Sequence, residues 1–189
     1  MSTAHTKAHY TADDLLTMPD GDQYELVDGE LVKKDMSEES TSIVGWLVHF
    51  LAGFAYPRKL GMVMPEQSYR CFPGDPDKVR RPDVSFVLAE KRPDGPLRYG
   101  HTPTAPDIAV EVVSPGDEAY GLEEKIADYR SAGIPLIWIV YPNTRTVYVY
   151  QGGSEVPSVL HETDALTGGE ILPGFSVKVA DLFPPAVSI

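Results

Sequence analysis

Three short apolar runs dominate the pattern of hydrophobic and polar positions, at residues 84–88, 107–113 and 136–141. Their length and the turn residues that flank them predict buried β-strands. Glu111 lies inside the second run, and burying a polar group without a partner costs about 2–7 kcal/mol, or more when the group is ionised. The sequence therefore requires either that a partner neutralises Glu111 or that the protein uses its charge.

An amphipathic helix is predicted between the second and third runs, after a Ser-Pro-Gly turn at residues 114–116. Its apolar positions recur every three or four residues and form one stripe that faces the sheet, made of Leu122, Ile126, Tyr129 and Gly133. Lys125 lies at the edge of this stripe, so its ammonium can reach inward along its aliphatic stem. Because side chains alternate along a strand, Glu111 has a defined face, and we expect it to meet Lys125.

The remaining pattern predicts hairpins and helices around these strands. Asp28-Gly29 between two alternating segments is a strong hairpin signal. The other predicted elements are a short helix capped by Thr11, a helix over 40–56, paired strands over 62–72 and 81–88, a hairpin of strands 136–141 and 146–150, and a long loop over 91–106. We expect residues 1–189 to form a single domain, with residues 1–9 as a loose terminus.

A second acidic residue, Asp83, follows Pro82 and should lie at the mouth of a strand, because proline cannot donate to a central ladder. Asp83 and Glu111, with Lys125 nearby, form a candidate site for Mg²⁺ or Mn²⁺, since these ions prefer oxygen ligands and keep positions open for water and phosphate. Each residue also has a structural interpretation: Asp83 as a strand-edge cap, Glu111 as the ion-pair partner of Lys125, and Lys125 as part of a solvated helix face. Glu66 would add a carboxylate to the site or face solvent.

At these residues the chain resembles the PD-(D/E)XK nuclease superfamily and, within it, the Uma family of restriction endonucleases. Pro82-Asp83 matches the PD motif, and Glu111-Val-Val-Ser-Pro matches the end of the family's acidic strand. Lys125 and Tyr129 match the lysine and tyrosine of the following helix. The resemblance extends over nearly the whole chain, through further matching segments at 24–32, 137–142, 172–176 and 182–183.

The resemblance implies an α/β fold with a restriction-endonuclease-like core, in which helices flank a mixed central sheet and a β-hairpin lies near the N-terminus. It implies a metal-dependent endonuclease that hydrolyses phosphodiester bonds of nucleic acid, expected to be DNA, as a homodimer with one site for each strand. Asp83, Glu111 and the backbone carbonyl of Val112 would then bind Mg²⁺ or Mn²⁺, and Lys125 would orient water or stabilise the transition state. Tyr129 is a further candidate, with a place in the core as its alternative.

The chain departs from the family pattern at two places. Val113 stands where the superfamily has the lysine of an E-x-K strand, so the resemblance implies that Lys125 takes over that role. Residues 39–42, Glu-Ser-Thr-Ser, stand where the family often has a histidine before its first long helix. The second departure leaves the role of that helix open.

Composition limits the partners and the location of the protein. The chain has 189 residues, a formal net charge of −12 and a pI of about 4.7, which opposes DNA binding. A local basic edge around Asp83 is nevertheless predicted, from Arg70, Lys78, Arg80, Arg81, Lys91, Arg92 and Arg98. The single Cys71 fits a reducing compartment, and no apolar run approaches the length of a membrane span. We therefore expect a cytoplasmic protein without a membrane partner.

A second class of function fits the same residues: a nuclease fold that no longer cuts and serves as an interaction or regulatory module. The acidic charge and the valine at position 113 favour this alternative. The joint presence of Asp83, Glu111 and Lys125 favours the enzyme, because a scaffold has little use for a charge inside its central strand. The distance between Lys125 and Glu111 discriminates between the two, since the enzyme requires that they lie close together.

Overall fold

The computed structural model describes residues 9–184 and is built around a six-stranded sheet. In spatial order its strands are β3 (Gly61–Pro65), β4 (Val84–Leu88), β5 (Ile108–Val112), β6 (Leu136–Tyr141), β7 (Thr146–Gln151) and β8 (Ser158–Leu160). The β5 and β6 strands are parallel because a helix connects them, and the other neighbouring pairs are antiparallel. This arrangement confirms the expected α/β fold with a mixed central sheet.

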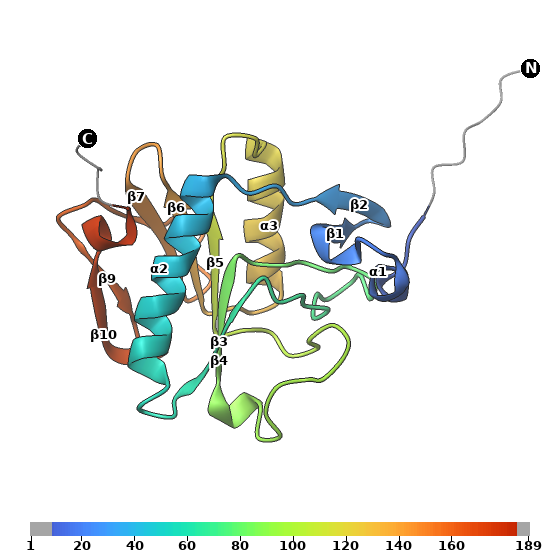
Figure 1. Ribbon diagram of the computed structural model, residues 1–189, viewed down its shortest axis with the longest axis horizontal. Helices are drawn as coiled ribbons and strands as arrows, with labels where there is room; N and C mark the ends of the chain where they lie inside the picture. The colour runs from blue at the N-terminus through green and yellow to red at the C-terminus, as the bar shows by residue number, and fades with distance from the viewer. Residues whose placement is uncertain (1–8, 185–189) are drawn as a thin grey trace, which may run out of the picture.

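The two long helices, α2 (Glu38–Ala55) and α3 (Ala119–Ser131), lie on opposite sides of the sheet (Figure 1). The even-numbered residues of β5 belong to the same apolar cluster as the buried face of α2, and Ala109 belongs to the cluster that contains Ile126 and Tyr129 of α3. Because side chains alternate along a strand, Glu111 lies on the α3 side, as predicted.

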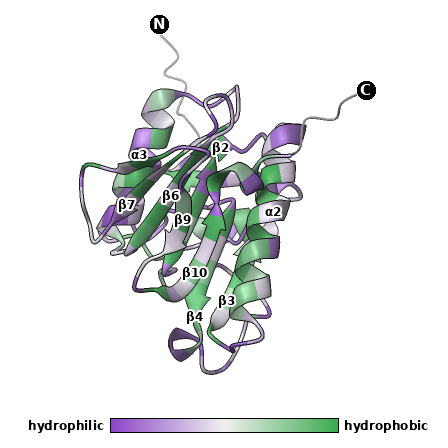
Figure 2. Cartoon of the chain, turned by 90° about the vertical axis from the view of Figure 1, so that its left-hand side faces the viewer, coloured by the Kyte–Doolittle hydropathy of each residue, from purple (hydrophilic) through white to green (hydrophobic). Residues whose placement is uncertain are grey.

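A C-terminal hairpin completes the larger apolar cluster beside α2 (Figure 1). It consists of β9 (Ala165–Gly168) and β10 (Leu172–Lys178), and the short 3₁₀ helix η3 (Val179–Leu182) follows it. Trp138 of β6 stacks on Phe175 of β10, with 6.0 Å between the ring centroids. In Figure 2 the strands of the central sheet are mostly green, whereas many connecting loops are purple, so the apolar residues gather in the sheet layer.

The N-terminal hairpin lies on the α3 side of the sheet (Figure 1). Its strands β1 (Tyr24–Val27) and β2 (Glu30–Lys33) are joined by Asp28 and Gly29, whose φ angles of 50° and 76° suit a two-residue turn of type I′. Leu26 exchanges two backbone hydrogen bonds of 2.9 Å with Val79, which anchors the hairpin to the segment before β4. The predicted hairpin is therefore confirmed.

The first helix, α1 (Ala12–Thr17), begins with the capping box that Thr11 and Asp14 predict, and the 3₁₀ helix η1 (Gly21–Gln23) leads into the hairpin. No helix within residues 9–184 is both long and apolar enough to cross a membrane. The loose terminus expected over residues 1–9 falls, for residues 1–8, outside the described part of the chain.

The paired strands predicted over 62–72 and 81–88 are shorter than expected. β3 ends at Pro65, and Glu66 then adopts a φ of 51°, which interrupts the extended conformation that a ladder needs. Beyond that point Tyr69 forms an isolated bridge with Arg80, which lies just before the second segment. The long loop predicted over 91–106 is present after the 3₁₀ helix η2 (Ala89–Lys91).

Candidate active site

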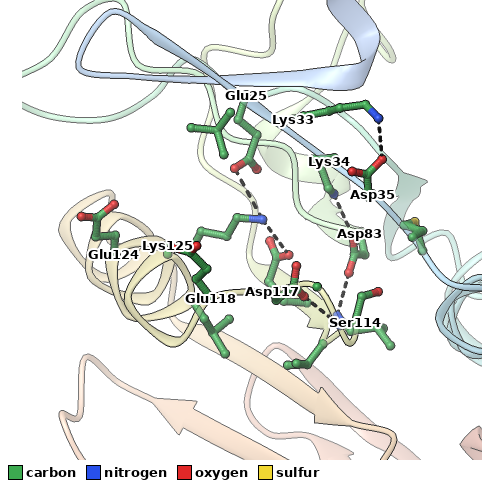
Figure 3. A pocket seen from close by; sticks show the side chains of 18 of the residues that line it. Glu25, Lys33, Lys34, Asp35, Asp83, Ser114, Asp117, Glu118, Glu124 and Lys125 are labelled. Atoms are coloured by element: carbon green, nitrogen blue, oxygen red, sulfur yellow. Dashed lines mark hydrogen bonds and ion pairs between the residues drawn. The ribbon is translucent and has the colours of Figure 1, made fainter.

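A cavity of about 450 Å³ opens where β5 ends, between the end of the N-terminal hairpin and the first turns of α3 (Figure 3). Asp83, Glu111 and Lys125 all line it, together with Val112 and Ser114. The strand-turn-helix segment supplies most of these residues, and Asp83 reaches the same place because β4 pairs with β5. The fold thus brings the three predicted residues to one cavity.

Glu111 is buried, with 5% of its surface exposed, and both of its carboxylate oxygens have partners. Tyr129 donates its hydroxyl hydrogen to Oε1, and the Lys125 Nζ atom lies 3.3 Å from Oε2. Burial raises the pKa of Glu111 to about 7, although the nearby Lys125 ammonium acts in the opposite direction. The folded protein therefore places a carboxyl group there that gains or loses a proton near neutral pH.

Asp83 is buried immediately before β4, and it bridges the hairpin and the sheet. Its Oδ1 lies 2.7 Å from Nζ of Lys34, and its Oδ2 accepts a hydrogen bond of 2.6 Å from the backbone N–H of Val112. The second contact is the one that the strand-edge-cap interpretation requires. Burial raises the pKa of Asp83, while the Lys34 ammonium and the Val112 N–H oppose that rise. Asp83 therefore has a structural contact and also a place in the cavity.

Lys34 is a member of the site that the sequence did not indicate. It follows β2 directly, and its ammonium contacts three groups: Asp83, the backbone carbonyl of Arg81 at 2.5 Å, and Oε2 of Glu66 at 3.1 Å. Figure 3 shows the Lys34 and Asp83 side chains pointing toward each other. Burial alone would lower the pKa of Lys34, but the surrounding carboxylates raise it above its usual value. Lys34 is therefore a permanent positive charge beside Asp83.

Glu25 is the second residue that sequence reasoning missed. It is fully buried on β1, and its Oε2 lies 3.4 Å from Nζ of Lys125 and 3.1 Å from a guanidinium nitrogen of Arg80. Burial would raise the pKa of Glu25, but Lys125 and Arg80 lower it below the usual value. Lys125 therefore lies between two carboxylates, Glu25 and Glu111, and these hold its ammonium inside the cavity. Figure 3 shows the Lys125 side chain pointing toward Glu25.

Arg80, the ion-pair partner of Glu25, makes further ion-pair contacts with α3. Arg80 is 2% exposed and also contacts Oδ2 of Asp128 on α3 at 2.6 Å. Lys78 reaches the other oxygen of Asp128 at 2.8 Å. These ion pairs connect the segment before β4 to α3, so they fix the position of the helix that carries Lys125.

Three further predicted residues have different outcomes. Glu66 contacts Lys34 but does not line the cavity, so it belongs to the edge of the network. Tyr129 combines both of its interpretations, since it packs in the core beside Phe72 and also hydrogen-bonds Glu111. Val112 lines the cavity and donates its N–H to Asp83.

The N-terminus of α2, whose role the sequence left open, touches the end of β5. Ser40 is buried there, and its hydroxyl lies 2.9 Å from that of Ser114. The backbone N–H of Ser114 donates a hydrogen bond of 2.7 Å to Asp117. These contacts hold the turn after Glu111 in place at the edge of the cavity.

The two acids suit a divalent cation in chemistry, since both carboxylates are buried at one cavity and burial raises the pKa of both. A bound cation would favour the ionised form of both carboxylates. Within residues 9–184 there is no preformed cluster of three or more His, Cys, Asp or Glu that could hold a metal. Lys34 and Lys125 instead supply the positive charge, so an entering cation must displace an ammonium from Asp83 or Glu111.

Comparisons with known proteins identify a family and a shared fold. A family model, Uma2, described as "Putative restriction endonuclease", matches residues 12–180. The structure is similar to the crystal structure of a "putative nuclease belonging to DUF820" from Anabaena variabilis, with a TM-score of 0.77 and 21% sequence identity. That match covers 92% of this chain and 97% of the other chain, which shows a shared fold. A search among curated proteins gives no match.

Proposed function

This chain belongs to the Uma2 family, and from that membership and the site geometry we propose that it is a metal-dependent endonuclease that hydrolyses phosphodiester bonds of DNA. One observation carries the proposal: two buried acids, Asp83 and Glu111, and the partly buried Lys125 converge on one open cavity from three separate parts of the chain. Buried charges are costly, and structural stability alone gives little reason to gather them there. Perturbed carboxyl groups in a cleft are typical of catalytic sites.

Asp83 and Glu111 would hold Mg²⁺ or Mn²⁺, with the backbone carbonyl of Val112 as a further oxygen ligand. When bound, such an ion supplies Lewis acidity toward the phosphate and toward a nucleophilic water. Lys125 has the position to orient that water or to stabilise the negative charge that develops on the phosphate, because Glu25 and Glu111 keep its ammonium in the cavity. Lys125 would thus take the role of the strand lysine of the superfamily, at whose position this chain has Val113.

Lys34 has the complementary role of keeping Asp83 ionised and oriented until a cation enters. Its ammonium lies on the Oδ1 atom, whereas the Val112 N–H fixes Oδ2. The side chain is long and also contacts Glu66 at the edge of the network, so it can shift toward Glu66 without losing every partner. This arrangement allows Asp83 to exchange an ammonium for a metal ion.

A homodimer would supply one such site for each strand of a duplex. The outer face of α2 offers an exposed aromatic cluster for this contact, in which Trp46 is 40% exposed and stacks on Phe50 with 5.7 Å between the ring centroids. Equilibrium sedimentation of the wild type and of Trp46→Lys tests this part of the proposal. A dimer that the substitution separates would support it, and a monomeric wild type would contradict it.

The alternative of an inactive nuclease-fold module is favoured by one observation. All four carboxylate oxygens of Asp83 and Glu111 already have partners inside the protein. Supercoiled plasmid separates the two functions when it is incubated with Mg²⁺ or Mn²⁺ and either the wild type, Glu111→Gln or Lys125→Met. Nicking by the wild type, with a loss of about a hundredfold or more in both variants, supports the endonuclease. Wild-type protein that leaves the plasmid intact supports the inactive module.

A further inference from the structure

A second cavity, of about 290 Å³, lies between the segment before β4 and the long loop after η2. Three arginines line it, Arg81, Arg92 and Arg98, and no acidic side chain among the described residues does so. The other polar groups in its wall are hydroxyls and an amide, from Ser68, Tyr99, Thr102 and Gln67. The cavity therefore presents hydrogen-bond donors and positive charge to whatever enters it.

The ion pairs of the structure explain why this cavity concentrates free positive charge. Of the seven basic residues between Arg70 and Arg98, four pair with a carboxylate: Arg70 with Asp77 at 3.0 Å, Lys78 with Asp128 at 2.8 Å, Arg80 with Glu25 at 3.1 Å, and Lys91 with Asp107 at 2.8 Å. The other three make no ion pair within residues 9–184, and they are the three arginines that line the cavity. The predicted basic edge is thus reduced to a single basic cavity.

Arg81 connects this cavity to the candidate active site. Its backbone carbonyl accepts the hydrogen bond from Lys34, and its guanidinium donates a hydrogen bond of 2.8 Å to the backbone carbonyl of Glu66. Its buried Nε atom has no hydrogen-bond partner in the described part of the chain. Arg81 is two residues from Asp83, and two residues of chain span at most about 7 Å. The cavity and the candidate active site therefore lie close enough for one DNA strand to reach both.

The mouth of the active-site cavity shows why an anionic substrate needs such an anchor. Asp35, Asp117, Glu118 and Glu124 line that cavity in addition to the buried acids, and the whole chain carries a net charge of −12. These charges repel a polyanion at the place where cleavage would occur. A separate cation-rich contact next to the site offsets that repulsion.

We propose that the cavity formed by Arg81, Arg92 and Arg98 binds a backbone phosphate of the DNA strand, next to the phosphate that lies at Asp83 and Glu111. This inference rests on the proposed function, since it names how the same site holds its substrate. Guanidinium groups donate paired hydrogen bonds to phosphate oxygens, so the three arginines suit this ligand. A phosphate contact is independent of base identity, so the cavity positions the strand without selecting its sequence.

The test measures the affinity for a fluorescent DNA duplex by anisotropy, with Ca²⁺ in place of Mg²⁺ and at several salt concentrations. The informative variant is Arg92→Gln/Arg98→Gln, which leaves Arg81 and the active site unchanged. The matched control is Arg58→Gln/Arg145→Gln, which removes the same charge outside the cavity: Arg58 lies over the ring of Phe54 and Arg145 pairs with Glu162. Thermal unfolding of both variants checks that each is folded.

We expect the cavity variant to bind the duplex about tenfold or more weakly than the wild type. The slope of log K against log salt should also fall by about 1 for each phosphate that the variant no longer neutralises. The control should retain affinity within about threefold. Equal decreases in affinity for the two variants would overturn the inference, because general charge would then explain binding. A wild-type protein that does not bind the duplex would also overturn it.

Plasmid cleavage by the same proteins distinguishes this inference from the proposed function. Metal-dependent cleavage by the wild type, with equal affinities of the two variants, would overturn the phosphate cavity and leave the endonuclease intact. A specific loss of DNA binding in the cavity variant, without cleavage by the wild type, would support the cavity and assign it to a nuclease fold that binds DNA without cutting it.

Discussion

Replacing Glu111 with glutamine should stabilise the protein at alkaline pH and leave its stability nearly unchanged at acidic pH, in the absence of divalent metal. In the unfolded chain the pKa of a glutamate is about 4.5, whereas burial raises that of Glu111 to about 7 in the folded protein. Between these values the folded state binds more protons than the unfolded state does. The free energy of unfolding of the wild type therefore falls as the pH rises through this window, and the Glu111 contribution levels off above about pH 7.

The difference between the two pKa values corresponds to about 3 kcal/mol at pH 8. Glutamine is neutral at every pH and keeps an oxygen that can accept the hydrogen bond from Tyr129. The variant should therefore exceed the wild type in stability by up to about 3 kcal/mol at pH 8, and the gap should close toward pH 4.5. Glu111 contributes to the raised pKa values of Lys34, Lys125 and Tyr129, but these groups stay protonated over this pH range, so the pH dependence of the difference reports Glu111.

Urea unfolding of both proteins between pH 4.5 and 8.5, in EDTA, measures this difference. Glu25→Gln is the matched control, because Arg80 and Lys125 lower the pKa of Glu25 despite its burial. Its ionised form stabilises the fold above the unfolded pKa, so this variant should lose about 3–5 kcal/mol at neutral pH, as expected for a broken buried pair. A Glu111→Gln variant that is less stable than the wild type at pH 8 would refute the reasoning.

Three further substitutions test the charged network around the cavity. Lys34→Met leaves the buried carboxylate of Asp83 without its ammonium, so thermal unfolding in EDTA should show that the variant is about 3–5 kcal/mol less stable than the wild type. Adding Mg²⁺ should raise the stability of the variant more than that of the wild type. An equal increase in both proteins would contradict the exchange of ammonium for metal. Tyr129→Phe removes the hydroxyl that donates to Glu111 and keeps the ring, so urea unfolding should show a free energy of unfolding lower by about 1–3 kcal/mol. An unchanged free energy would show that the hydrogen bond is dispensable. Arg80→Met breaks a buried ion pair and should lower the free energy of unfolding by about 3–5 kcal/mol in the same assay. Arg145→Met breaks a half-exposed ion pair with Glu162 and should lower it by less than about 1 kcal/mol. Similar losses for the two arginines would contradict the importance of burial.

Local signals in the sequence predicted most of the elements that position the site. Asp28-Gly29 specified the hairpin because that dipeptide tolerates the positive φ angles of its turn. The spacing of apolar residues on α3 predicted which face packs on the sheet, and this placed Lys125 near Glu111. These predictions succeeded because each depends on residues close together in the chain.

Lys34 and Glu25 could not be predicted in the same way. Lys34 meets Asp83 across 49 residues of sequence, and Arg80 meets Glu25 across 55. Contacts of this kind depend on where the hairpin docks on the sheet, and no periodicity or motif in a single sequence encodes that docking. The overlong strand over 62–72 has a different cause, because the positive φ of Glu66 has no signal such as glycine.

Calorimetric titration of Mn²⁺ into the wild type, Asp83→Asn and Glu111→Gln tests the central claim most directly, because it measures the metal site without requiring cleavage. We predict binding by the wild type at millimolar metal or below, and a loss of that binding in both variants. Binding should also strengthen as the pH rises through about 7, because Glu111 must be ionised to hold the metal. No binding by the wild type, or binding that persists in both variants, would contradict a metal site at Asp83 and Glu111 and would leave their contacts with Lys34 and Lys125 as structural ion pairs.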